Sequence, residues 1–159
     1  MEDAILTAQI FSAADRMAHY PLDAHRYRVL PNSAMRDRTP EHYRKVIFDI
    51  ANAAEAYHEL INGLPEDHPS LEKARKRLKT KQQAFVFFLL VRLMKSDLSL
   101  QEIRPLLIKF EPIDAYPLNQ FLGSDYDGIC YRILVWIFNQ KHLIVPFMRL
   151  YRILNLNFK

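Results

Sequence analysis

The segment 71-LEKARKRLKTKQQAFVFFLLVRLM-94 determines which architecture this chain is expected to adopt. Its first half carries six lysines and arginines, and its second half, from Ala84 onward, is apolar apart from Arg92. No glycine or proline interrupts it, and most of its residues favour helix. The pattern predicts one long helix that enters a hydrophobic core at its C-terminal half and leaves its N-terminal half in water.

The composition limits what the rest of the chain can form. The chain has 159 residues, of which 50% are hydrophobic and 25% are charged, so it is long enough for one domain with a real core. Three glycines are too few for an all-β protein with many tight turns. The 22 lysines and arginines exceed the 18 acidic residues, which gives a net charge of +4. This charge permits binding to nucleic acid or to an acidic membrane without requiring either.

Two further features bear on where the protein is found. The chain opens MEDAIL, which is acidic where a signal peptide is basic. The longest apolar runs are about half of the roughly 20 residues that a membrane-spanning helix needs. We therefore expect a cytoplasmic protein without a membrane span. We also expect Cys130, the single cysteine, to be a reduced and buried thiol.

Two segments before the central one have apolar residues at helical spacing. Residues 2–19 predict a first helix. Its apolar face is expected to contain Leu6, Ile10, Phe11, Ala14 and Met17. Thr39 as N-cap and Pro40 at the first helical position begin a second helix, whose apolar residues keep a 3.6-residue period for about six turns. Gly63 ends this helix and is expected to adopt the left-handed conformation.

The segments after the central helix predict shorter helices. Ser99 with Glu102 forms a capping box for a helix that reaches about Phe110. That helix is either kinked at Pro105 or begins there. Residues 117–122, bracketed by a proline and a glycine, predict a further short helix.

Two last helices complete the expected fold. Ser124 with Asp127 forms a second capping box, for a helix that continues to Phe138. Residues 144–156 predict the final helix. Together the segments predict an all-α single domain, a bundle of five to seven helices with two long central helices and no strand.

Residues 22–110 resemble a known family. The matching pieces are LPNSAMRDRTPEHYRKVIFDIANAAEAYHELI and LEKARKRLKTKQQAFVFFLLVRLMKSDLSLQEI. They are similar to the four-helix-bundle proteins that include the accessory variability determinants of diversity-generating retroelements and proteins encoded in intervening sequences of ribosomal RNA genes. The resemblance implies a basic, ring-forming bundle that binds RNA or a reverse transcriptase. It makes residues 22–110 the bundle core and 113–159 a C-terminal helical extension. The chain departs from the family because it has an additional helix before the match and lacks a glycine-rich end.

The basic residues of the central segment are the strongest chemical feature. They are Lys73, Arg75, Lys76, Arg77, Lys79 and Lys81. A helix with this charge is suited to contact the phosphates of RNA or DNA, with an affinity that falls as salt rises. The alternative is a solvated helical face that keeps the protein soluble. Antiparallel packing of the two long helices decides whether further basic residues extend the patch, namely Arg36, Arg38, Arg44 and Lys45.

No pattern of a catalytic or metal site is complete. Glu55 and His58 have the Glu-x-x-His spacing of carboxylate-bridged di-iron bundles, but such a site needs two copies and two further glutamates. One cysteine cannot complete a common structural zinc site, and no phosphate loop or nucleophile elbow is present. Asp125 and Asp127 are expected to serve a helix start rather than a metal. We therefore expect no enzymatic activity, no cofactor and no metal.

The C-terminal segment combines aromatic residues with arginines. Its candidates for a partner-binding face are Trp136, Phe147, Arg149, Tyr151 and Arg152. This composition is favoured at protein interfaces. The alternatives are an ordinary pair of core helices and a helix that lies on an acidic membrane.

These features support two functional hypotheses. The leading one is a non-enzymatic nucleic-acid-binding accessory protein that contacts phosphates through the basic helix. It favours RNA over DNA, a homo-oligomer, and a protein partner such as a reverse transcriptase. The alternative is a protein–protein interaction module, a regulatory adaptor or effector, that uses the aromatic C-terminal helices.

Overall fold

The computed structural model describes residues 2–14, 16, 18, 39–67, 70–96, 98–123 and 125–156. In this part of the chain the structure is all-α, as predicted, and contains no strand. The helices are α1 (Glu2–Ala13), α2 (Pro40–Asn62), α3 (Leu71–Lys95), the short 3-10 helix η2 (Leu100–Glu102), α4 (Ile103–Phe110), α5 (Ile129–Phe138) and α6 (Ile144–Leu156). The predicted basic residues Arg36 and Arg38 lie outside the described residues.

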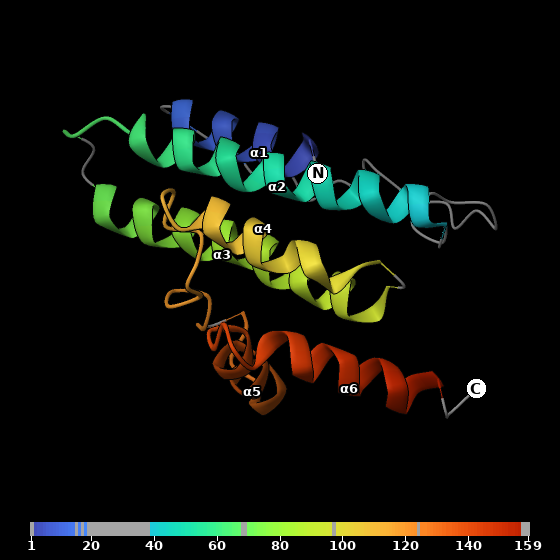
Figure 1. Ribbon diagram of the computed structural model, residues 1–159. Helices are drawn as coiled ribbons and strands as arrows, with labels where there is room; N and C mark the ends of the chain where they lie inside the picture. Colours follow the sequence, from blue (N-terminus) through green and yellow to red (C-terminus); the bar gives the residue numbers. More distant parts are fainter. Residues whose placement is uncertain are drawn as a thin grey trace.

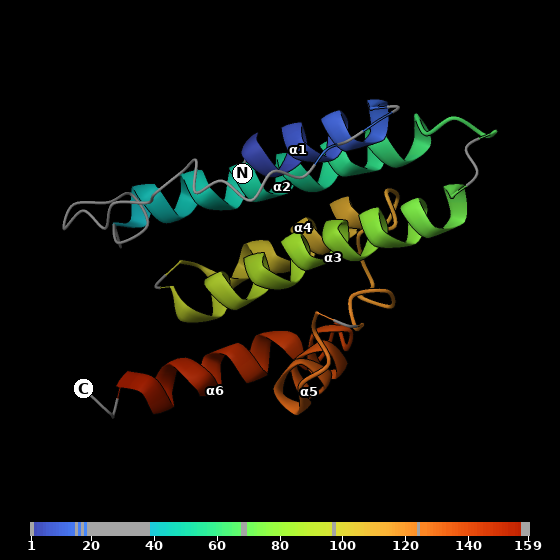
Figure 2. The same ribbon diagram turned by 180° about the vertical axis from the view of Figure 1, so that it is seen from behind.

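The helices form three layers, with α3 in the middle one (Figure 1, Figure 2). α1 and α2 form the layer on one side of α3, and α5 and α6 form the layer on the other side. α4 lies with α3 in the middle layer. α2 and α3 run antiparallel, so the end of α2 lies beside the first half of α3.

The C-terminal half of α3 is buried because other elements cover it from both neighbouring layers. Val86, Leu89 and Leu90 have no exposed surface. Burying side chains of this size contributes about 1.5–3 kcal/mol each. α2 meets α3 with the small buried residues Ala51 and Ala54, which allow close approach of the two helices. The predicted entry of this helix into the core is confirmed.

α2 begins and ends as predicted, but its C-terminal glycine has a different conformation. The Thr39 hydroxyl accepts a hydrogen bond from the His42 N–H at 3.3 Å, and Pro40 takes the first helical position. Gly63 has φ −86° and ψ 0°, so the prediction of a left-handed glycine is wrong. The Gly63 N–H donates to the Glu59 carbonyl at 2.9 Å, which continues the helical pattern into the turn. The chain then turns inward and buries Leu64.

α1 is shorter than predicted and has its apolar side toward solvent. It ends at Ala13 rather than near residue 19, and the large side chains Leu6, Ile10 and Phe11 of its apolar face are exposed. α1 instead contacts α2 beside its small residues, where the Tyr57 hydroxyl donates to the Ala4 carbonyl at 3.2 Å. An apolar period identifies one side of a helix but does not show which neighbour covers it.

The connection between α4 and α5 contains no helix in its described residues, so the predicted helix over 117–122 is wrong. The side chain of Gln83 explains the difference. Its Nε2 donates to the carbonyls of Asp114 (3.2 Å) and Pro117 (2.9 Å). Its Oε1 accepts from the Gln120 N–H at 2.7 Å. These bonds occupy backbone groups that a helix needs for its own hydrogen bonds.

Gln82, the preceding residue, is fully buried and joins three elements. Its Nε2 donates to the Ala54 carbonyl of α2 at 3.0 Å and to the Ile113 carbonyl of the connection at 3.2 Å. Its Oε1 is buried without a hydrogen-bond partner in the described part of the chain. The two glutamines of α3 therefore fix the position of α2 and of the α4–α5 connection.

α4 begins differently from the predicted capping box. The Ser99 hydroxyl accepts from the Gln101 N–H at 3.3 Å, and η2 precedes the α-helix. Pro105 is the third residue of α4. The missing N–H of a proline costs little there, because N–H groups of the first turn have no helical partner.

α5 begins at Ile129, after the position that the second capping box predicts. Gly128 precedes it and makes no side-chain cap, and Ser124 lies outside the described residues. The Asp127 carboxylate instead accepts a hydrogen bond from the Arg132 guanidinium at 2.6 Å. The predicted helix start at Ser124 is therefore wrong, because residues 125–128 are not helical, while the contacts of Ser124 lie outside the described residues.

Arg152 of α6 fixes the C-terminal end of α3. Its guanidinium donates to the carbonyls of Leu93 (2.6 Å), Leu98 (2.8 Å) and Met94 (3.4 Å). The last carbonyls of a helix lack helical partners and carry the negative end of its dipole. Arg152 satisfies carbonyls at this end and joins the outer layer to the middle layer.

Replacing Arg152 with alanine is expected to lower the free energy of unfolding by about 2–4 kcal/mol, because hydrogen bonds to a charged group are lost and the carbonyls stay half-buried. Lysine is expected to restore only part of this, because an ammonium does not match the planar guanidinium. Urea denaturation measures both variants. Arg149 is exposed on the same helix and provides the control, for which R149A should change stability by less than about 0.5 kcal/mol. Equal losses for R152A and R149A would contradict the role of Arg152.

Tyr116 joins the connection to the end of α5. Its hydroxyl donates to the Phe138 carbonyl at 2.9 Å, and the side chain is buried. Burial, with a smaller contribution from the negative charge of Glu111, raises the pKa of Tyr116 to about 12. A raised tyrosine pKa stabilises the folded state below the ordinary pKa of 10.0, and this stability is lost as the pH rises through the folded pKa.

Between pH 10 and pH 12 the protein is therefore expected to lose about 3 kcal/mol of stability through Tyr116. Tyr116→Phe should cost about 1–2 kcal/mol at pH 8, because it leaves the Phe138 carbonyl unpaired. The same variant should then lose less stability than the wild type as the pH rises above 10. Burial also raises the pKa of Tyr57, so some alkaline loss remains. Chemical denaturation from pH 8 upward tests this, and parallel curves for both proteins would contradict it.

Candidate functional site

The structure separates the six basic residues of α3 into two groups. Arg75 and Lys79 are half-buried on the side of α3 that faces α2 and the α4–α5 connection. The other four are exposed on adjacent turns: Lys73, Lys76, Arg77 and Lys81. Residues three and four apart lie next to one another on a helix surface. These four, which we call the α3 stripe, form the accessible cationic surface of α3.

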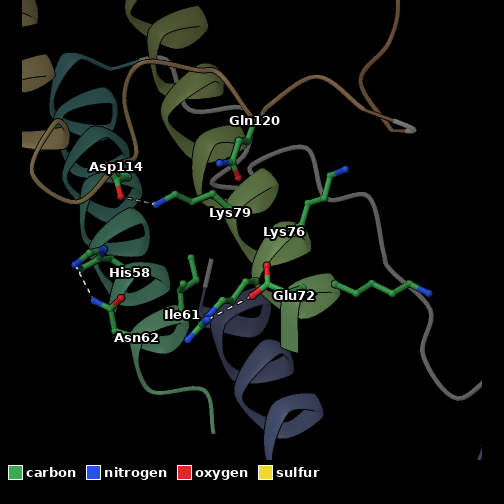
Figure 3. Close-up of a pocket in the computed structure, with 10 residues that line it drawn as sticks. His58, Ile61, Asn62, Glu72, Lys76, Lys79, Asp114 and Gln120 are labelled. Carbon is green, nitrogen blue, oxygen red and sulfur yellow. Dashed lines mark hydrogen bonds and ion pairs between the residues drawn. The ribbon is translucent and has the colours of Figure 1, made fainter. Parts of the chain in front are cut away.

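A hollow of about 710 Å³ lies between the end of α2, the first half of α3 and the α4–α5 connection (Figure 3). We call it the basic hollow. Its charged lining consists of Lys73, Arg75, Lys76, Lys79, Glu72 and Asp114. The cations outnumber the carboxylates, so the hollow attracts anions.

Lys79 lies inside this hollow rather than on the surface. Its side chain is only 13% exposed, and its Nζ lies 3.7 Å from the Asp114 carboxylate, toward which it extends in Figure 3. Its Nζ also donates to the Ile113 carbonyl at 3.3 Å. Burial lowers the pKa of Lys79, and the charge of Asp114 opposes this effect. Lys79 therefore acts first as a link between α3 and the connection.

Two other cations have carboxylates nearby. The Arg75 guanidinium lies 3.5 Å from Glu72, one turn earlier, and Lys81 Nζ lies 3.9 Å from Asp125. Both carboxylates and the Lys81 side chain are more than half exposed, and Arg75 is 39% exposed, so each pair contributes little stability and its carboxylate can be replaced by another anion. Among the described residues, no carboxylate lies within ion-pair distance of the remaining three: Lys73, Lys76 and Arg77.

Polar side chains complete the basic hollow. His58 and Asn62, one turn apart on α2, are joined by a hydrogen bond of 3.0 Å between Asn62 Nδ2 and His58 Nε2 (Figure 3). An amide nitrogen only donates, so this assignment makes Nε2 the acceptor and places the proton of the neutral ring on Nδ1. The Gln120 side chain lies on the other side of the hollow, on the connection.

A second hollow, of about 610 Å³, lies beside the other edge of the α3 stripe. Arg77 and Lys81 line it, as do small residues of α1. Its aromatic lining consists of Tyr57, Phe85, Phe88 and Tyr126. We call it the aromatic hollow. No pattern in the sequence pointed to Tyr126, because this residue belongs to the α4–α5 connection and reaches α3 only through the tertiary fold.

Arg44 and Lys45 do not extend the α3 stripe. Both are exposed near the start of α2, and Arg44 lines a different hollow together with Leu93 and Leu98. That position is about 25 Å further along α3 than Lys76. Antiparallel packing separates the start of α2 from the start of α3, so the proposed extension of the patch through these two residues is wrong.

The predicted partner-binding residues also fall into two groups. Trp136 and Arg149 are exposed. Phe147 and Tyr151 pack against the core, and Arg152 is bonded to carbonyls at the end of α3. These last three residues are therefore occupied within the chain and do not form a free docking face.

The structure adds apolar residues that the sequence had not identified as exposed. On α5, Ile129 and Ile133 are 73% and 52% exposed and lie on the same side as Trp136, which is 61% exposed. Cys130 is exposed as well, so the expectation of a buried thiol is wrong. α5 has its core-facing side at Val135 and Phe138, which leaves its first turn in solvent. On α6, three large side chains are exposed: Leu150, Ile153 and Leu154.

Glu55 and His58, the Glu-x-x-His pair of α2, each have a partner other than a metal-ligand group among the described residues. Glu55 forms an ion pair of 2.6 Å with Lys109, whereas His58 is bonded to Asn62. In the described part of the chain, no three His, Cys, Asp or Glu side chains are grouped as metal ligands. Asp125 and Asp127 each lie beside a cation instead, Lys81 and Arg132 respectively.

No helix among the described residues is long and apolar enough to cross a membrane. Comparison of the chain with models of known families, with curated proteins and with solved structures gave no match. The family resemblance noted from residues 22–110 therefore stays a prediction.

Proposed function

We propose that this protein is a non-catalytic nucleic-acid-binding accessory protein whose α3 stripe contacts phosphates. One observation carries the proposal: four exposed cations occupy adjacent turns of α3, and three of them have no carboxylate partner among the described residues. Four phosphate contacts to a single strand correspond to a slope of about −3 in a plot of log affinity against log salt.

The neighbouring basic hollow supports this proposal. It adds Arg75 and Lys79 behind the stripe, so the positive potential extends from the surface into a concave site. Arg77 can contact phosphate oxygens through two parallel N–H groups, whereas lysines act as point charges. The family resemblance favours RNA over DNA as the ligand, and it favours an oligomer.

A matched pair of double variants tests the stripe. Lys76→Ala with Arg77→Ala is expected to weaken binding to a short RNA strand by roughly 10- to 30-fold at 0.1 M salt and to reduce the salt slope by about 1.4. Arg44→Ala with Lys45→Ala removes the same charge at the distant end of α2. Because about 25 Å exceeds the screening length, that control should change the affinity less than about threefold. Fluorescence anisotropy titrations at several salt concentrations measure both.

Equal losses in the two variants would show that only net charge matters. Binding that does not respond to salt, or no binding at all, would remove the proposal altogether.

A second candidate function is supported by the exposed apolar side of α5. Ile129, Ile133 and Trp136 repeat at helical spacing and form an exposed apolar surface, which is typical of an interaction site. Residues 128–159 contain cations and no aspartate or glutamate, so a protein partner with an acidic rim fits this surface. The observation favours a protein-interaction module on the outer layer, separate from the α3 stripe.

Trp136 is the only tryptophan, so its emission reports directly on this surface. In dilute protein we expect the Trp136 indole to be solvated. Its emission maximum should move to shorter wavelength when a second copy of the chain or a partner protein covers it. Ile133→Ala with Trp136→Ala should abolish association in sedimentation while changing the free energy of unfolding by less than about 0.5 kcal/mol, because the side chains are exposed. Phe48→Ala, an exposed aromatic on α2, is the control. Emission that stays constant at all concentrations and with added reverse transcriptase would contradict this function.

A further inference from the structure

Three aromatic rings form a column from the core to the aromatic hollow. Phe87 and Phe121 stack with centroids 4.3 Å apart and an interplanar angle of 15°. Phe121 and Tyr126 stack at 4.7 Å and 16°. Phe87 and Phe121 are buried, whereas Tyr126 is only half-buried. The column therefore ends at the surface with the ring of Tyr126.

Among the described residues, no second aromatic ring is stacked on Tyr126 beside that of Phe121. Phe121 covers one face, so the Lys81 ammonium, 5.7 Å from the ring centroid, lies over the other. Phe88 stands nearly edge-on to Tyr126 at 5.8 Å and 69°, and it is 38% exposed. The site thus has a flat floor, an aromatic wall and a cation that is shared with the α3 stripe.

We propose that the aromatic hollow binds an unpaired nucleobase, stacked on Tyr126 as the fourth ring of this column, while Arg77 and Lys81 contact the adjoining phosphates. This inference rests on the proposed nucleic-acid function and names its ligand as a single strand. A base within a duplex has both faces covered by its neighbours, so only an unpaired base can offer a free face to Tyr126.

A base stacked on the outer face of Tyr126 takes the place of the Lys81 ammonium over the ring, and Lys81 then contacts the adjoining phosphate. Its ammonium is shared between the Tyr126 ring and the Asp125 carboxylate at 3.9 Å, and both side chains of that ion pair are largely exposed. A phosphate can replace Asp125 at small cost, because exposed ion pairs contribute little. The small residues Ala4 and Ala8 of α1 leave room on the opposite side of the hollow.

The experiment compares three RNA ligands of equal length on the full chain: a single oligoadenylate strand, the same strand with an abasic site at each position in turn, and a duplex. Wild-type protein should bind the single strand more tightly than the duplex, and one or more abasic positions should weaken it by roughly 5- to 100-fold. Because the abasic ligand keeps every phosphate, this readout does not depend on altering the protein.

Variants locate the effect. Tyr126→Leu should weaken binding to the single strand by the same roughly 5- to 100-fold, and the abasic ligand should cause no further loss of affinity. The slope of log affinity against log salt should stay the same, because no phosphate contact is removed. Tyr126→Phe keeps the ring and should bind as the wild type does. Phe48→Leu is the matched control for loss of an exposed aromatic residue. Thermal unfolding of each variant shows whether the column is still folded.

The outcomes separate the two levels of the proposal. Salt-dependent binding with equal affinity for single strand, abasic strand and duplex would overturn the stacking inference and leave the phosphate proposal standing. Wild-type protein that binds none of the three ligands would overturn both.

Discussion

The hydrogen bonds of two neighbouring glutamines hold the features of this molecule that bear on function. Gln82 and Gln83 sit side by side on α3 where its polar half meets its apolar half. Their amides bind the backbone of α2 on one side and of the α4–α5 connection on the other. The connection supplies Asp114 and Gln120 to the basic hollow and Tyr126 to the aromatic hollow. Because a buried amide costs free energy unless it is bonded, these contacts also fix a single path for the connection.

This constraint explains how a strongly charged helix divides its cations. The connection lies against one side of α3, where it half-buries Lys79 and offers Asp114 as its partner. The four cations of the α3 stripe stay exposed, although Lys73 and Lys76 also line the basic hollow and Lys81 lies beside Asp125 of the connection. The basic residues of α3, which look alike in the sequence, therefore have different roles. Lys79 links α3 to the connection, and the α3 stripe is an exposed cationic surface. Under the proposed function, the exposed cations of the stripe are the ones that exchange their counterions for the phosphates of a ligand.

The sequence predicted those elements whose evidence is local. The boundaries of α3 and α6 and the start of α2 follow from periodicity, proline position and an N-cap, and the structure confirms them. The predicted helix over 117–122 fails because Gln83, more than thirty residues earlier, binds its backbone groups. The prediction of a buried Cys130 is wrong for a related reason, because burial depends on which elements pack against a helix. The exposure of the apolar side of α1 has the same cause. Tyr126 was missed because its role comes entirely from rings brought to it by the fold.

The three layers also separate two kinds of surface. In the middle layer, most apolar side chains in the second half of α3 are buried, whereas the first half of α3 has exposed charged side chains. Both outer layers, by contrast, leave large apolar side chains in water, among them Phe11 on α1 and Trp136 on α5. Apolar surface on a folded chain is stabilised when another molecule covers it. The two proposed functions would therefore use different layers: partner binding the outer ones and phosphate contact the polar half of the middle one. Because Arg152 joins α6 directly to the end of α3, a partner bound on the outer layer has a rigid connection to the helix that carries the α3 stripe.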